Sequence, residues 1–201
     1  VMDPLDVIDV NGDSTYMLMR EGCRRSHPVF WCTPADLYAE GGRCHARCQR
    51  VLVSEAHPYF ETQEWNNMDL GAFDVVWLRK DPPFDIAYIF STYMLDLVPS
   101  STLVLNHPAS IRDANEKMVA LRYSEFVPPT LVTCEIDRAL KWIAEAPGKV
   151  VLKPWDGNGG RGVLISKHGD GNLRSMLEVL TENQKVHILV QHHVPEIVAG
   201  D

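Results

Sequence analysis

A glycine-rich loop between two strand-like segments constrains the fold of this chain more than any other feature. The apolar residues 150–154 precede the loop, and residues 163–166 follow it. The loop, residues 157–162, matches the pattern G-x-G-x-x-G, but a dinucleotide-binding fold needs a helix directly after the glycines. A P-loop is also excluded, because no Lys-Ser or Lys-Thr pair follows. We expect a hairpin whose backbone N–H groups can close over phosphates, although the loop alone fits an ordinary flexible hairpin equally well.

Two lysines are candidates for contacting phosphates. Lys153 lies four residues before Gly157, at the end of an apolar strand, from which its point charge could reach phosphates beneath the loop. A surface lysine at a strand end is the alternative. Lys117 is the second candidate, although its place on a predicted helix is more typical of a solvated lysine.

Strand-like and helix-like segments alternate along the chain, which indicates an α/β fold. We expect a small, Rossmann-like open-sheet domain at residues 1–110 and a second domain at residues 111–201. In the first, strands are expected at 29–33, 37–39, 44–53, 74–79 and 102–105, and helices at 13–25 and 86–97. In the second, helices are expected at 115–123, 137–146 and 173–180, and strands at 130–133, 150–154, 163–166 and 186–191.

A charged turn follows the predicted strand 74–79. Arg79, Lys80 and Asp81 precede a Pro-Pro pair at the carboxyl end of this strand, which is the edge where open α/β sheets bind ligands. Arg79 suits a substrate carboxylate, because a guanidinium can pair with both carboxylate oxygens. A polar loop that closes a βα unit is the alternative explanation.

The composition argues against several classes of function. The formal net charge is −8 and no basic stripe is visible, so a nucleic-acid partner is not expected. No apolar stretch reaches the roughly 18 residues of a membrane span. The first residues show no signal-peptide pattern, and Val1 to Pro4 resemble the end of a strand. Five cysteines, an odd number in 201 residues, argue against a disulfide framework.

A metal site on cysteine or histidine is also disfavoured. Cys44 and Cys48 alternate, together with Ala46, with polar residues, as on a strand with one buried face. Free cysteines in such positions behave as small apolar residues. His192 and His193 are neighbours on a predicted strand and would point to opposite faces, so they cannot easily bind one metal.

Six segments, taken together, resemble bacterial glutathione synthetases. They occur in the order seen in that family and cover essentially the whole chain. The most specific are RKDPPFD at 79–85 and the LKP-x-DG-x-GG pattern at 152–160. The others are residues 1–4, 106–108, 112–117 and 128–133, and the stretch 191–201 is also similar.

The resemblance implies a pre-ATP-grasp domain at 1–110, followed by the first lobe of an ATP-grasp fold at 111–201. It implies the ligation of γ-glutamylcysteine and glycine through an acyl phosphate, while ATP becomes ADP and phosphate. Mg²⁺, or Mn²⁺ in its place, would accompany ATP, with its ligands beyond residue 201. The resemblance further implies a cytoplasmic homo-oligomer that binds small molecules, with no nucleic acid and no membrane. We expect the 201 residues alone to be inactive.

The family's ATP contacts correspond to the two lysines, the glycine-rich loop as a phosphate lid, and a segment whose backbone meets adenine. These residues are Lys117, Lys153, Gly157, Asn158, Gly159, Gly160, Arg161, Gly162, Gln191, His192, His193, Val194 and the acidic Asp201. A weaker assignment to the peptide substrate covers Arg79, Lys80, Asp81, Asp13 and Ser14. No catalytic residue or metal ligand is assigned within the chain. Two alternatives remain: another ATP-grasp carboxylate–amine ligase, or a non-catalytic nucleotide-binding module.

Overall fold

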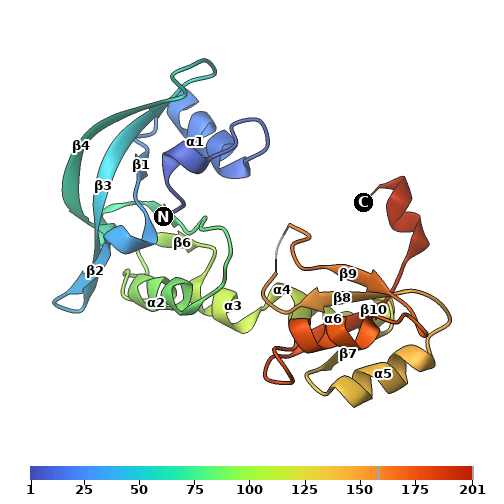
Figure 1. Ribbon diagram of the computed structural model, residues 1–201. Helices are drawn as coiled ribbons and strands as arrows, with labels where there is room; N and C mark the ends of the chain where they lie inside the picture. The colour runs from blue at the N-terminus through green and yellow to red at the C-terminus, as the bar shows by residue number, and fades with distance from the viewer. Residues whose placement is uncertain (158, 201) are drawn as a thin grey trace. The chain divides into compact units, whose positions relative to one another are not determined.

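The computed structural model describes every residue except 158 and 201, and the chain divides into two compact units, Val1–Asp113 and Ala114–Asp201 (Figure 1). Each unit has its own apolar core. Among the described residues, no helix combines the length and the apolar character that a membrane crossing requires. The predictions for Asn158 and Asp201 lie outside the described residues.

An antiparallel sheet around one long strand dominates the first unit. The strand β3 (Arg43–Val53) pairs along one edge with β4 (Phe60–Asp69). Its other edge pairs with β2 (Leu37–Glu40) and β1 (Phe30–Trp31). The predicted β2–β3 hairpin is confirmed, whereas β1 is shorter than expected and β4 was not predicted at all.

The two ends of β3 bury opposite faces. Cys44, Ala46 and Cys48 belong to one core cluster, whereas Val51 packs with Met19 in another. Residues on a strand alternate between faces, so the spacing of three between Cys48 and Val51 reverses the buried side. The β3–β4 pairing is irregular at the same point, between Gln49 and Val51.

A parallel pair of strands completes the first unit. β5 (Val75–Trp77) and β6 (Leu103–Leu105) are connected through the helix α2 (Ile86–Leu95), as the alternating pattern predicts. The chain start lies beside this pair, where Met2 forms a parallel bridge with Arg79. The remaining helices of the unit are α1 (Ser14–Arg24), α3 (Pro108–Asp113) and the 3-10 turns η1 (Leu5–Val7), η2 (Pro34–Asp36) and η3 (Leu70–Ala72).

The second unit is an antiparallel sheet in the order β7-β10-β8-β9. Its strands are β7 (Thr130–Thr133), β8 (Val150–Pro154), β9 (Leu164–Ser166) and β10 (Ile188–His192). Two helices, α5 (Ile136–Ala144) and α6 (Leu173–Leu180), pack against one face and against each other (Figure 1). The predictions for β7, β8 and α6 match in both bounds.

The segment that leads into this sheet differs from the prediction. In place of one helix at 115–123, α4 (Glu116–Ala120) is followed by the 3-10 segment η4 (Leu121–Phe126). Tyr123 has non-helical backbone angles inside that segment, and Pro128 lies two residues beyond its end. Because the residue before a proline favours an extended backbone, the chain becomes extended before β7. After β10 the chain forms a last 3-10 turn, η5 (Pro195–Ala199).

Candidate functional site

A row of polar side chains crosses the face of the second sheet opposite α5 and α6. Leu152 points into the core beneath these helices, so Lys153, the next residue on β8, points to the other face. Its Nζ donates to Oε1 of Gln191 on β10 at 2.8 Å, and Nε2 of Gln191 donates to Oγ1 of Thr130 on β7 at 2.8 Å. These bonds hold the Lys153 ammonium group in place across three neighbouring strands.

The glycine-rich loop is the turn of the β8–β9 hairpin, as predicted. Gly159 and Gly160 are exposed, have φ values of +55° and +74°, and face open space where a side chain would begin. Gly157 is different, because a Cβ atom there would lie 2.6 Å from Cγ of Pro154 and 2.9 Å from the carbonyl oxygen of Arg161. The loop therefore has a close-packed base and a bare, exposed backbone at its tip.

Lys117 reaches the same loop from α4. Asn115 caps this helix, accepting hydrogen bonds from the backbone N–H groups of Lys117 and Met118 at 3.1 Å each. The Lys117 ammonium group donates to the carbonyl oxygen of Gly157 at 2.5 Å and to Glu116 at 2.8 Å. Only 15% of the Lys117 side chain is exposed, so it is not the solvated helix lysine that the sequence favours. The two lysines thus contact one hairpin: Lys153 from its base and Lys117 at Gly157.

The segment after β10 runs along the end of the same sheet. The backbone N–H of His193 donates to the carbonyl oxygen of Lys149 at 3.0 Å, and Val194 is partly exposed beyond it. The His192 ring packs on Trp142 of α5, with ring centroids 4.8 Å apart. His192 therefore points to the helix-covered face, away from Lys153, and only its backbone lies beside the polar row.

In the first unit, Arg79 meets the start of α1. Its Nη2 donates to Oγ of Ser14 at 2.6 Å, and its Nε donates to Oγ1 of Thr15 at 3.3 Å. Asp13 caps the helix by accepting the backbone N–H of Thr15 at 2.6 Å. The structure thus brings together three of the residues that the sequence assigned to the substrate: Arg79, Ser14 and Asp13.

Lys80 and Asp81 are held by the chain start. Lys80 Nζ lies 2.8 Å from Oδ1 of Asp3, and Oδ2 of Asp3 accepts the backbone N–H of Asp81 at 2.7 Å. Asp3, Thr15 and Thr130 were not singled out from the sequence. Asp3 does lie in the family-like segment 1–4, which was the only signal available for it.

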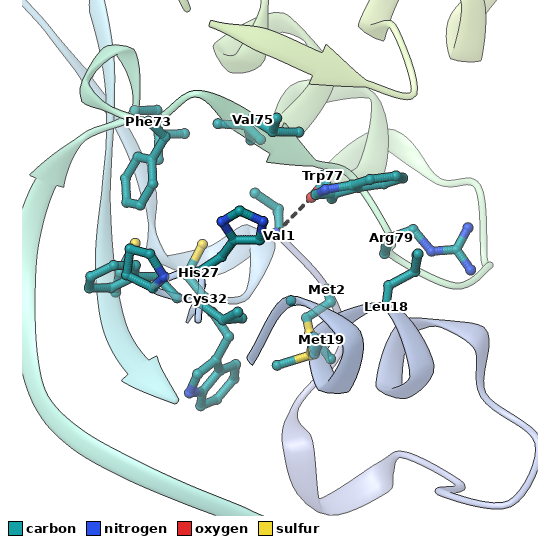
Figure 2. A pocket seen from close by; sticks show the side chains of 18 of the residues that line it. Val1, Met2, Leu18, Met19, His27, Cys32, Phe73, Val75, Trp77 and Arg79 are labelled. Atoms are coloured by element: carbon teal, nitrogen blue, oxygen red, sulfur yellow. Dashed lines mark hydrogen bonds between the residues drawn. The ribbon is translucent and has the colours of Figure 1, made fainter. Parts of the chain in front are cut away.

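A cavity of about 650 Å³ lies within the first unit, lined mainly by apolar residues (Figure 2). Val1, Phe73, Val75 and Trp77 are labelled around it in Figure 2, together with Cys32. Arg79 and Thr15 also belong to its lining. All the residues that line the cavity belong to the first unit, whereas the two lysines belong to the second.

Among the described residues, no group of three or more His, Cys, Asp and Glu side chains is placed to hold a metal ion. Cys44 and Cys48 are buried in the core at 1% and 3% exposure, in line with a strand that buries one face. His45, between them, instead stacks on Tyr38 with ring centroids 5.3 Å apart.

Comparison with known proteins covers the whole chain. Residues 1–112 match the family model described as prokaryotic glutathione synthetase, N-terminal domain, and residues 116–201 match its ATP-grasp domain. The chain is 36% identical to the glutathione synthetase of Shewanella oneidensis over 203 aligned positions and 37% identical to that of Bradyrhizobium diazoefficiens over 201. Each comparison covers 100% of this chain and 64% of the relative.

Solved structures show the same fold at low sequence identity. D-alanyl-alanine synthetase A from Vibrio cholerae has a TM-score of 0.55 at 14% identity, over 90% of this chain and 54% of that one. The ATP-grasp ligase PsnB, complexed with precursor peptide PsnA2 and AMPPNP, has a TM-score of 0.51 at 17% identity, over 91% and 62%.

Proposed function

Because the chain belongs to the prokaryotic glutathione synthetase family, we propose that it is part of a ligase that joins γ-glutamylcysteine to glycine with ATP. This part would bind the nucleotide and the peptide acid. The convergence of Lys117 and Lys153 on one glycine-rich hairpin carries the proposal. The chain spans 64% of the length of the relatives named above, so the activity of the whole protein is an inference from this part.

The two lysines would hold the phosphates of ATP beneath the hairpin. Each ammonium group already donates to a neutral oxygen, of Gln191 for Lys153 and of Gly157 for Lys117, and Lys117 also donates to the exposed carboxylate of Glu116. A phosphate oxygen carries more charge than an amide or carbonyl oxygen, so hydrogen bonds from the lysines to phosphate would be stronger, with charge on both donor and acceptor. Because both side chains are already ordered, binding would cost less conformational entropy than ordering two free lysines.

The tip of the hairpin would close over the phosphates. Gly159 and Gly160 adopt positive φ angles and carry no side chain, so their N–H groups can approach an anion closely. A closed lid also keeps water from the transferring phosphoryl group and from the reactive intermediate. Gln191 to Val194 would supply the backbone that meets the adenine ring.

The peptide acid would bind in the first unit. Arg79 presents a planar guanidinium at the N-terminus of α1, where Ser14 and Thr15 hold it in position. A carboxylate at this point would gain a bidentate pair with Arg79 and the favourable end of the helix dipole. The remaining polar side chains of this binding site would be Lys80, Asp81 and Asp13.

The proposed reaction has two steps. A carboxylate oxygen of γ-glutamylcysteine attacks the γ-phosphorus of ATP, and ADP leaves, giving an acyl phosphate. The glycine amine then attacks the acyl carbon, phosphate leaves, and the amine gives up its proton. The lysines serve the first step by neutralising charge on the phosphoryl oxygens as the bond to ADP breaks.

The metal and the assembly belong to the proposal as well. Mg²⁺ would accompany ATP, although the described residues contain no group of three or more His, Cys, Asp and Glu side chains placed to hold it. By family resemblance we also propose a cytoplasmic homo-oligomer. Light scattering on the purified protein would test the oligomer.

A substrate panel on the full-length protein tests the function. Phosphate release from ATP should be fastest with γ-glutamylcysteine and glycine together. If another acid and amine pair were clearly faster, the protein would be a different ATP-grasp ligase. If ATP bound but no pair released phosphate, a nucleotide-binding module would be the correct assignment.

A further inference from the structure

Two buried cysteines of the first unit face each other across β1 and β3. Cys32 directly follows β1, and Cys48 lies on β3; both belong to the same core cluster, at 2% and 3% exposure. Trp31 pairs with Gln49 in the antiparallel ladder, so the next pair in the same register is Cys32 with Cys48.

The hydrogen-bond pattern shows which kind of pair this is. Val51 N–H donates to the carbonyl oxygen of Val29, so positions 29 and 51 form a hydrogen-bonded pair. Such pairs alternate with non-hydrogen-bonded ones, which places Cys32 and Cys48 at a non-hydrogen-bonded position. The carbonyl oxygen of Cys32 indeed turns away from β3 and accepts the N–H of Met2 at 3.0 Å.

A non-hydrogen-bonded pair has the geometry that a disulfide needs. Its Cα atoms lie about 4.5 Å apart and its side chains approach closely, within the range of disulfide-bonded cysteines. Cys44 lies in the same cluster, but it pairs with Ala39 of β2 and is no part of the cavity lining. Cys32 and Cys48 both line the 650 Å³ cavity of the first unit.

The two thiols also differ in pKa, and thiol–disulfide exchange requires one cysteine that forms a thiolate more readily. The Cys48 thiol donates a hydrogen bond to the sulfur of Cys32, which lowers the pKa of Cys32 below its ordinary value although burial opposes this. The pKa of Cys48 is raised, because it provides that hydrogen bond and is itself buried. These directions favour Cys32 as the attacking thiolate and Cys48 as the thiol that keeps its proton to higher pH.

We propose that Cys32 and Cys48 form a reversible cross-strand disulfide site, oxidised by small neutral disulfides that enter the apolar cavity. The Cys32 thiolate attacks one sulfur of the reagent, forms a mixed disulfide and releases one thiolate. Cys48 then loses its proton and attacks the Cys32 sulfur, which closes the protein disulfide and releases the second thiolate. Two protein thiols are oxidised as one small disulfide is reduced to two thiols.

Oxidation of this pair would make the conformational freedom of the first unit depend on the ratio of thiols to disulfides in the surrounding solution. The new bond would tie β1 to β3 beside the cavity wall. It would also close a short loop and thereby restrict the unfolded chain. The proposal depends on the first unit alone and stands whether or not the ligase activity is correct.

Peptide mapping of the oxidised chain is the test. The purified, reduced protein is treated with 2-hydroxyethyl disulfide, and free thiols are counted after denaturation. Two of the five thiols should be lost. Trypsin places the three relevant cysteines on separate peptides, 26–43, 44–47 and 48–50, so mass spectrometry should find 26–43 linked to 48–50. Dithiothreitol should restore all five thiols.

Variants separate this pair from general thiol reactivity. Cys48→Ala should trap the mixed disulfide on Cys32, whereas Cys32→Ala should leave Cys48 unmodified. The matched control Cys44→Ala should form the 32–48 link as before. Five thiols remaining in the wild-type chain, or a link from Cys32 to Cys44, would overturn the proposal.

Discussion

The ammonium group of Lys117 lies 2.5 Å from the carbonyl oxygen of Gly157, forty residues further along the chain. This bond joins the helix before the second sheet to the base of its glycine-rich hairpin. It places a largely buried positive charge at the point where the loop leaves β8. The hairpin and its lysine therefore act as one unit, and a change at either residue should affect nucleotide binding.

Gly157→Ala should weaken ATP binding by about tenfold or more, because the new Cβ atom would overlap Pro154 and the backbone of Arg161. The loop must shift, and the Lys117 contact shifts with it. Gly148→Ala is the matched control, since nothing lies within 4 Å of its Cβ position. Calorimetric titration with a non-hydrolysable ATP analogue measures both, and equal affinities would contradict the role of Gly157.

Lys153→Met should lower the affinity for ATP by about 10- to 100-fold, which corresponds to the loss of a hydrogen bond to a charged group. Lys149→Met, on an exposed side chain one residue before β8, should bind normally. The same calorimetric titration compares the two. A Lys149→Met variant as weak as Lys153→Met would show that net charge, rather than the position of Lys153, holds the nucleotide.

Leu177→Ala should destabilise the second unit by about 2–5 kcal/mol, because its side chain is fully buried between α6 and the sheet. Val179, on the same helix, is 75% exposed, so Val179→Ala should change the free energy of unfolding by less than about 0.5 kcal/mol. Urea denaturation followed by tryptophan fluorescence measures both. Similar losses for the two variants would contradict the assigned core.

The alkylation rate of Cys32 should rise with pH earlier than that of an ordinary thiol. Its pKa is lowered from 9.0 by the hydrogen bond from Cys48, so its thiolate forms at a lower pH than a free cysteine's. Cys48→Ala removes this bond and leaves burial, so the rate profile should move to higher pH. Iodoacetamide labelling with peptide mapping follows peptide 26–43 across pH 6 to 10, and an unchanged profile in Cys48→Ala would refute this cause.

The 201-residue chain by itself should bind ATP without releasing phosphate. Its described residues include the two lysines proposed to hold the phosphates. They contain no group of three or more His, Cys, Asp and Glu side chains placed for a metal ion, which phosphoryl transfer from ATP needs. A coupled phosphate assay with γ-glutamylcysteine, glycine and Mg²⁺ measures this, with the full-length protein as the positive control. Glutathione formation by the chain alone would place the metal site within these residues.

Strong local patterns were predicted well, and weak ones were missed. β8 and α6 match in both bounds because each has a clear apolar period that is buried in one core. The strand β4 was not predicted, because its residues are mostly polar and exposed and show no alternation of apolar and polar side chains. Its strand character comes from hydrogen bonding along β3, which a single segment of sequence does not reveal.

The glycine-rich loop, the strands beside it and the lysine before it were apparent from the sequence alone. These features are local, because steric limits on φ and the period of a strand act on neighbouring residues. Only the tertiary structure placed Lys117 against Gly157 and turned His192 away from Lys153. It likewise brought Cys32 opposite Cys48. These relationships join residues far apart in the chain, and they depend on strand register and packing, which sequence periodicity does not specify.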